Sequence, residues 1–284
     1  MTTGETTKLL DAAKPFIEMA IVEDIGPGDA TSESVLPVDL ELHGRIFAKK
    51  GGIIAGLPIA EEVFGRVEPA LRFVGHVSDG DLVSRGQIVA EVFGPGRGML
   101  AAERIALNFL QQLSGIATLT RVFVDAIADS GATILDTRKT RPGYRALEKY
   151  AVRMGGGQNH RMSLHDMLLI KDNHIEAAGS ITDAVARSRQ AYPDLPVEVE
   201  VKDLEELEEA LLVGVDRIML DNMTAEQMQE AAEIAAGRVA LEASGNVNLE
   251  RIAAIAATGV DYISIGALTH SAPALDLSML VESL

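Results

Sequence analysis

The sequence contains no cysteine and no tryptophan. The lack of cysteine excludes disulfide bonds, thiolate metal sites and a catalytic thiol. No apolar run approaches the roughly 18 residues that a membrane-spanning helix requires, and the start MTTGETTKLL lacks the apolar core of a signal peptide. We therefore expect no membrane partner, and a cytoplasmic location agrees with the missing cysteine.

Positive charge and aromatic side chains are also scarce. The 284 residues include 25 Lys and Arg against 42 Asp and Glu, with a net charge of −17, and only 4 Tyr and 7 Phe. This balance argues against a nucleic-acid partner, which would require a basic surface. The hydrophobic fraction of 47% is typical of a globular protein with a substantial core.

The few cations are unevenly distributed along the chain. Between Arg138 and Arg161, seven Lys or Arg residues stand against one acid, Glu148. A run of charge is usually a solvated face, and that alternative stays open. The interleaved glycines and histidines favour a site for anions instead. Within this run, the segment RALEKYAVRM places Arg145, Lys149 and Arg153 on one helix face, and Gly155 is placed to end the helix.

The pattern of hydrophobic residues changes near residue 115. Residues 41–56 and 74–98 show short β-like runs with turn signals, and residues 101–131 show helical spacing, which predicts one or two long helices. After residue 130, six β-rich runs appear, and the later ones alternate with helical segments at spacings of about 20 residues. The runs are residues 132–139, 166–173, 196–202, 216–222, 238–245 and 261–268.

Repeated β/α units predict a parallel sheet covered by helices. Six units are fewer than the eight of a complete barrel, so we favour an incomplete α/β barrel, with an open doubly wound sheet as the alternative. In both folds ligands bind beyond the carboxyl ends of the strands. Polar residues follow each run: Asp136 to Lys139, Lys171 to His174, Glu200 to Lys202, Asp221 and Asn222, Glu242 to Asn246, and Ser264 to Ala267.

These strand ends suggest two kinds of anion site. Ser244-Gly245-Asn246 and Gly266-Ala267 fit phosphate binding, because glycine lets backbone N–H groups approach the oxygens. Glu200 and Asp221 end adjacent strands and would suit Mg²⁺ together with substrate phosphates; the alternative is a pair of carboxylates matched to cations.

A second group of polar residues suits a dicarboxylate. Arg138, Arg161 and Lys171 with His160 would bind such a ligand, Arg by bidentate geometry and Lys as a point charge. His165 and His174 are interpreted as structural or as support for neighbouring ligands.

The segment DTRKTRPGYRALEKYAVRMGGGQNHRMSLHDMLLIKDNH closely resembles the signature of the quinolinate phosphoribosyltransferase family. The resemblance extends to residues 23–32, 102–118, 197–201, 218–222, 241–247 and 263–278. Arg141, where the family often has a smaller or apolar residue, is a minor departure.

The resemblance implies a particular fold, activity and assembly. The fold would be an N-terminal α/β sandwich domain of residues 1–115, joined by residues 271–284, and an incomplete α/β barrel of residues 116–270. The enzyme would convert quinolinate and 5-phosphoribosyl 1-diphosphate, with Mg²⁺, into nicotinate mononucleotide, diphosphate and CO2 in NAD biosynthesis. It would be a homodimer, in some relatives assembled further, with Arg104 contributed in trans.

The resemblance also implies a role for each matching residue. Quinolinate would be held by Arg104, Arg138, His160, Arg161 and Lys171. Lys139, Glu200 and Asp221 would serve the phosphoribosyl donor and its metal as catalytic residues. The 5-phosphate would lie at Ser244, Gly245, Asn246, Ser264, Gly266 and Ala267, and Thr137 would also bind substrate.

Two other functions stay open on the residues alone. A barrel aldolase would use Lys139 or Lys171 as a Schiff-base nucleophile, because cationic neighbours help to activate such a lysine. A biotinyl- or lipoyl-type carrier module would fit the hairpin rhythm of SDGDLVSRGQIVAEVFG, although its modified lysine is not evident; only Lys49 and Lys50 precede a glycine pair.

Overall fold

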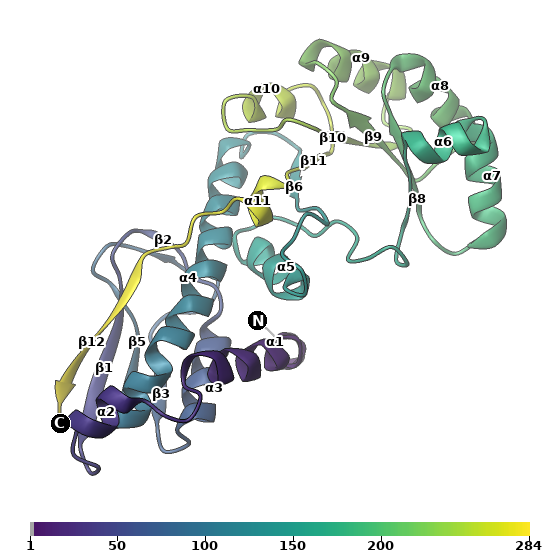
Figure 1. Cartoon of the computed structure of the whole chain (residues 1–284). Helices are drawn as coiled ribbons and strands as arrows, with labels where there is room; N and C mark the ends of the chain where they lie inside the picture. Colours follow the sequence, from purple (N-terminus) through teal and green to yellow (C-terminus); the bar gives the residue numbers. More distant parts are fainter. Residues whose placement is uncertain (1–2) are drawn as a thin grey trace. The chain divides into compact units, whose positions relative to one another are not determined.

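The structure is a computed structural model, and it describes residues 3–284 in two compact units (Figure 1). The first unit comprises the chain up to residue 121 with residues 142–156 and 271–284. The second comprises residues 122–141 and 157–270. Within residues 3–284, no helix is long and apolar enough to cross a membrane.

The first unit contains a four-stranded antiparallel sheet in the order β12-β1-β5-β3, a two-stranded sheet of β2 and β4, and five helices. The strands are β1 (Glu41–Ala48), β2 (Gly52–Ile53), β3 (Arg72–Gly75), β4 (Leu82–Val83), β5 (Ile88–Pro95) and β12 (Leu277–Ser283). The helices are α1 (Thr3–Asp24), α2 (Ala30–Val35), α3 (Leu57–Val67), α4 (Gly96–Ala126), whose last residues enter the second unit, and α5 (Arg145–Met154). Leu42, Ile46 and Ala48 of β1 are buried, as alternation on a half-covered sheet requires.

Helix α4 is one continuous helix of 31 residues. It begins at Gly96, five residues before the predicted helical segment. Two close approaches fix its position in the first unit. A Cβ at Gly115 would lie 2.1 Å from the Pro273 carbonyl oxygen, and a Cβ at Gly44 of β1 would lie 2.9 Å from the Met99 sulfur. At Gly115 the neighbour is backbone, so only glycine leaves room there, and at Gly44 the Met99 side chain would have to move. These contacts join the helix to the C-terminal segment and to the sheet.

The second unit is an incomplete α/β barrel, which confirms the predicted fold class. Its six parallel strands lie in the order β6-β11-β10-β9-β8-β7. Neighbours in the chain are therefore neighbours in the sheet from β7 to β11, and β6 joins at β11. A doubly wound sheet would instead reverse its strand order near the middle. The strands are β6 (Thr133–Leu135), β7 (Leu168–Ile170), β8 (Val197–Val201), β9 (Arg217–Asp221), β10 (Ala240–Ser244) and β11 (Tyr262–Ser264).

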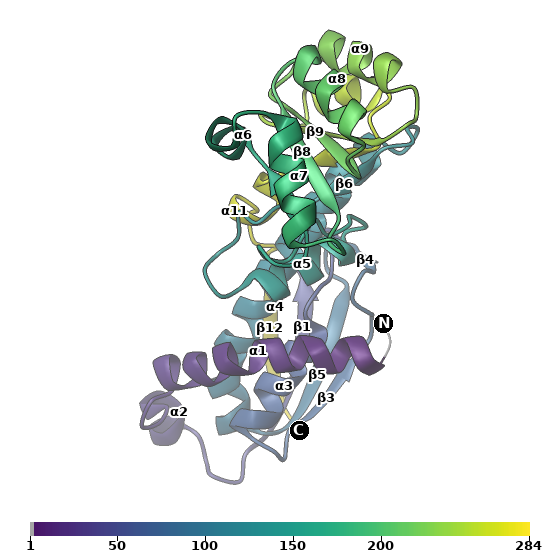
Figure 2. The same cartoon turned by 90° about the vertical axis from the view of Figure 1, so that its right-hand side faces the viewer.

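Helices cover the outside of this sheet (Figures 1 and 2). They are α6 (Asp172–Ala178), α7 (Ile181–Ala191), α8 (Leu204–Val213), α9 (Ala225–Ala235) and α10 (Ile252–Ala256). The short helix α11 (Ala267–His270) follows β11 and contacts the loop after β6, where the Thr269 hydroxyl donates to the Lys139 carbonyl. Side-chain caps start three of them: Ser180, Asp203 and Thr224 each accept a backbone N–H of the first turn.

Strand residues alternate between the two faces of the barrel sheet. In β8, Val197, Val199 and Val201 are buried on the face that the helices cover. Glu198 and Glu200 occupy the other parity and therefore point into the barrel.

Candidate active site

A cavity of about 600 Å³ lies at the carboxyl ends of the barrel strands. Residues from the ends of β7, β8, β9 and β10, from the loop that follows β6 and from the segment before β7 line it. They are Thr137, Arg138, Lys139, His160, Arg161, Leu169, Lys171, Glu200, Asp221, Asn222, Ser244, Gly245 and Asn246. The structure thus brings most of the predicted site residues into one place.

Asp136, which is fully buried, holds the loop with His160 and Arg161 beside β6. Its Oδ1 accepts the His160 backbone N–H at 2.9 Å, and its Oδ2 accepts the Asn159 side-chain N–H at 2.6 Å. Gln158 adds a parallel bridge to Leu135. These bonds make residues 158–160 an extension of the sheet at the side where β6 and β7 are not paired.

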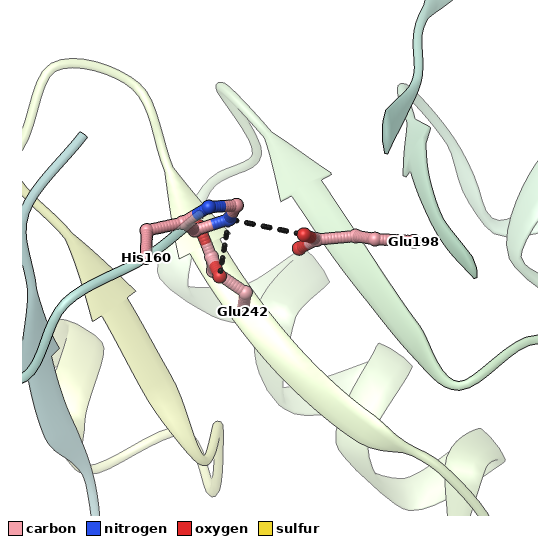
Figure 3. A group of neighbouring side chains, drawn as sticks. All are labelled: His160, Glu198 and Glu242. Carbon is pink, nitrogen blue, oxygen red and sulfur yellow. Dashed lines mark ion pairs between the residues drawn. The ribbon is translucent and has the colours of Figure 1, made fainter. Parts of the chain in front are cut away.

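His160 lies over two buried glutamates (Figure 3). Its Nε2 is 3.0 Å from Glu198 Oε2 and 3.4 Å from Glu242 Oε2. Burial disfavours the imidazolium, but the contacts with the two carboxylates outweigh burial and raise the pKa of His160 to about 9. Nδ1 accepts the Arg161 N–H at 2.7 Å, a bond that requires Nδ1 without hydrogen. The two carboxylates favour the imidazolium, which has hydrogen on both nitrogens, whereas the Arg161 N–H favours a ring without hydrogen on Nδ1. In both forms Nε2 carries a hydrogen.

Arg138 and Arg161 bring two positive charges close together. Burial and the neighbouring Arg138 lower the pKa of Arg161 below its usual range, while Glu198 partly offsets them. The Arg161 guanidinium donates to the Met167 carbonyl at 3.1 Å, which fixes its direction. A ligand with two negative charges would relieve the repulsion between these arginines.

The carboxylates of Glu200 and Asp221 both line the cavity. Glu200 forms an ion pair with Lys171, and Asp221 Oδ2 accepts the Asn222 side-chain N–H at 2.8 Å. Two carboxylates at one opening match the hard oxygen donors that Mg²⁺ prefers, with substrate phosphates completing the ligand set. The residues present therefore fit the cation that the sequence suggests.

The Ser244-Gly245-Asn246 loop is held against the end of β9. Gly245 has φ +93°, and a Cβ there would lie 2.2 Å from Asn222 Oδ1. Asn222 and Asn246 also have positive φ, 55° and 50°, and the Asn246 side chain donates to Asn222 Oδ1 at 3.0 Å. The loop thus needs glycine both for its backbone conformation and for the close contact.

Four predicted residues do not line this cavity. Ser264 is buried, and its hydroxyl lies 3.5 Å from the Ala243 carbonyl oxygen. A Cβ at Gly266 would lie 2.8 Å from Lys139 Cδ, so Gly266 leaves room for that lysine. Ala267 begins α11, and Arg104 is exposed on α4 in the first unit.

Three cations of the basic run also lie elsewhere. Arg145, Lys149 and Arg153 are on α5, which ends at Met154 before Gly155 as predicted, and they belong to the first unit. His165 is 2.8 Å from the Ser163 hydroxyl, and His174 Nδ1 accepts the Lys171 N–H at 3.0 Å.

Several residues of the site had no predicted role. Asn222 directly follows Asp221, which was predicted, and the hydrogen bond from Asn246 is the feature that marks Asn222 as part of the site. Glu198, Arg217 and Asp136 lie inside or directly after strands. The sequence pattern that could have identified them is a charged residue within a strand of a parallel sheet, because both faces of such a sheet are covered.

A parallel barrel with cationic side chains, two carboxylates and a glycine turn at its carboxyl end defines an α/β-barrel enzyme for anionic small molecules. A model of the quinolinate phosphoribosyl transferase C-terminal domain matches residues 116–280, and a model of the N-terminal domain matches residues 29–114. The chain belongs to the quinolinate phosphoribosyltransferase family.

Individual proteins show the same likeness over nearly the whole chain. A probable nicotinate-nucleotide pyrophosphorylase (carboxylating) of Bacillus subtilis is 45% identical, over 94% of this chain and 92% of that protein. The tobacco (Nicotiana tabacum) quinolinate phosphoribosyltransferase (decarboxylating) 1b is 43% identical, over 95% and 82%. The crystal structure of NadC from Streptococcus pyogenes superposes with a TM-score of 0.94 at 42% identity, over 97% of this chain and 98% of that one.

Proposed function

We propose that this chain transfers the phosphoribosyl group of 5-phosphoribosyl 1-diphosphate to the ring nitrogen of quinolinate. Loss of the 2-carboxylate as CO2 then gives nicotinate mononucleotide, and diphosphate is released. The observation that carries the proposal is the cavity itself: in a protein of net charge −17, it gathers Arg138, Lys139, Arg161 and Lys171 around two carboxylates. Both substrates are polyanions, and these four cations would offset their negative charge.

The chemistry follows from charge. When diphosphate leaves, the ribose becomes oxocarbenium-like, and Lys139 stabilises the charge on the leaving group. The pyridine nitrogen attacks C1 and becomes positively charged. The electron pair of the breaking ring–carboxylate bond then moves toward that nitrogen, CO2 departs, and the ring carbon takes a proton. No Schiff base is needed, so the main task is to hold two mutually repelling anions in attack geometry.

Lys139 is well supported for its role. Its carbonyl accepts the Thr269 hydroxyl at 2.8 Å, and its backbone N–H donates to the Thr137 hydroxyl at 3.0 Å. The side chain passes over Gly266, where no Cβ obstructs it. The aldolase alternative is weaker for Lys171, because its ion pair with Glu200 is the contact of an ammonium group and not of a free amine nucleophile.

The decisive assay offers quinolinate, nicotinate and nicotinamide as competing acceptors and measures the mononucleotides formed. Quinolinate should be strongly preferred, because a site that pairs buried charges discriminates against a ligand that leaves them unpaired. Release of label from the 2-carboxyl group as CO2 should match the nucleotide formed. Equal turnover of nicotinate would contradict the proposal.

Mg²⁺ is proposed as the cofactor, held by Glu200 and Asp221 with the donor's phosphates. Bound there, it would neutralise charge on the diphosphate leaving group. Asp221→Ala should raise the Mg²⁺ concentration needed for half-maximal donor binding, while quinolinate binding without donor should change little. Loss of quinolinate affinity with unchanged metal dependence would reverse this assignment.

A homodimer with Arg104 acting in trans is also proposed. Arg104 is exposed on α4, whereas every residue lining the cavity comes from the second unit. Arg104→Ala and Lys139→Ala protomers, each inactive alone, should regain activity after subunit exchange. Random exchange makes about half the dimers mixed, so about a quarter of all sites should recover. With exchange confirmed independently, no recovery would place Arg104 in its own protomer's site.

A further inference from the structure

A layer of charge lies inside the barrel beneath the cavity. Glu198 on β8 and Glu242 on β10 have no exposed surface. Both carboxylates face His160 Nε2, as Figure 3 shows. Arg217 on β9 reaches the same Glu242 Oε2 at 3.0 Å, and its guanidinium lies 4.2 Å from the centre of the Tyr262 ring. The layer therefore holds two acids, a guanidinium and an imidazole.

Such a layer is costly for stability alone. Removing two carboxylates from water carries a penalty that attraction to their partners only partly offsets, and apolar side chains of similar size often serve a core as well. The three groups His160, Glu198 and Glu242 also resemble a metal-ligand set. However, the Arg217 guanidinium already contacts Glu242, so a cation of the protein itself provides the positive charge there.

The layer is connected to the cavity through His160. The Nε2 edge of the ring faces the two glutamates, and Nδ1 accepts the backbone N–H of Arg161. Because both ring nitrogens are engaged, the ring orientation fixes the backbone from which the Arg161 side chain leaves. Glu198 also favours the charged form of Arg161, which Arg138 disfavours.

We propose that Glu198 and Glu242 are positioning residues for the acceptor side of the cavity, which act through His160 on Arg161 and touch no substrate themselves. Both keep a ring hydrogen on Nε2 and leave Nδ1 to Arg161, and Glu198 also offsets the repulsion between the two arginines. This inference rests on the proposed function, because the ligand that Arg161 awaits is the dicarboxylate acceptor.

Two substitutions at Glu198 test the idea. Glu198→Met keeps the length of the side chain and removes the acceptor, whereas Glu198→Gln keeps an acceptor oxygen without the charge. Glu198→Met should raise the quinolinate Kd, measured calorimetrically without donor, about tenfold, which corresponds to about 1.4 kcal/mol. Glu198→Gln should restore most of that affinity. The KM for the phosphoribosyl donor should stay within about twofold in both, because Glu198 contacts no donor-side residue.

A spectroscopic readout separates positioning from packing. In ¹⁵N-histidine-labelled protein, the His160 Nε2 should carry hydrogen in the unsubstituted chain. Glu198→Met removes one of the two carboxylates at Nε2, so it should shift the Nε2 resonance and lower the pKa of the ring. Glu209→Gln is the matched control: Glu209 is a half-buried carboxylate of the same unit that accepts hydrogen bonds from Thr182. It should leave the Kd and the histidine spectrum unchanged.

If Glu198→Met does not fold, the double variant Glu242→Gln/Arg217→Gln provides a second test. It removes the ion pair between Glu242 and Arg217 without leaving one charge unpaired, and should weaken quinolinate binding about threefold.

Two results would overturn the inference: a quinolinate Kd within twofold of the unsubstituted chain, or an equal loss for both substrates with an unchanged His160 spectrum. If the unsubstituted chain itself fails to bind quinolinate, the proposed function fails instead, and the spectrum alone then tests whether Glu198 orients the ring.

Discussion

Replacing Gly245 by alanine should separate the backbone conformation of the Ser244-Gly245-Asn246 loop from its contact with Asn222. An alanine at φ +93° costs about 1–2 kcal/mol in conformational strain. The new Cβ would also lie 2.2 Å from Asn222 Oδ1 and 3.0 Å from the Asn222 backbone nitrogen. Asn222 must therefore move, which breaks its bonds with Asn246 and Asp221, at about 0.5–1.5 kcal/mol each.

Gly237 provides the control. It has φ +71° in the same unit, and a Cβ there would meet nothing within 4 Å. Gly237→Ala should therefore lose stability and keep activity. Gly245→Ala should in addition lose about 10- to 100-fold in kcat/KM for the phosphoribosyl donor, because a displaced loop misplaces its N–H donors, while the quinolinate Kd stays unchanged. The assay is initial rates against donor concentration. Equal kcat/KM for the two variants would show that the Asn222 contact has no part in donor binding.

Two further predictions concern stability. Gly65→Ala in α3 meets nothing within 4 Å and should raise stability by about 0.5–1 kcal/mol, whereas Gly115→Ala, 2.1 Å from the Pro273 carbonyl, should lower it by about 1–3 kcal/mol or prevent folding; urea unfolding measures both, and the reverse order would contradict the packing of α4. The hydrogen bonds from Ser32 and Thr31 to Asp29, the N-cap of α2, lower its pKa below 3.8. The folded pKa is the lower one, so the contribution of Asp29 is present above about pH 4 and is lost as pH falls further. Asp29→Asn keeps the cap and should flatten that acid limb, and Asp29→Ala should cost about 1 kcal/mol at neutral pH; an unchanged acid limb in Asp29→Asn would exclude this carboxylate as its cause.

The fold was largely predictable because the barrel repeats one unit. Each β/α repeat contains residues that mark where its helix begins, such as the N-caps Asp203 and Thr224, so local patterns predict the six strands. Segment 142–156 is different. Its helix was evident from spacing, but a Cβ at Gly155 would lie 2.4 Å from the Ala117 carbonyl oxygen, and that tertiary contact with α4 has no signal in the local sequence. Spacing therefore located the helix and could not assign it to the first unit.

The residues of the site also differ in how far the sequence predicts them, and the difference follows their depth in the barrel. Side chains at the mouth, such as Glu200, are predictable because a polar residue that ends an apolar strand has one obvious position. The layer below is not predictable, because the alternation VEVEV is also the pattern of a strand with one face in water. In a parallel sheet covered by helices there is no wet face, so the first glutamate of that pattern must be buried in the barrel interior. A buried carboxylate needs a partner, and His160 at 3.0 Å from Glu198 is that partner. The period of two thus places Glu200 in the wall of the cavity and Glu198 beneath the histidine, and only the tertiary structure distinguishes the two positions.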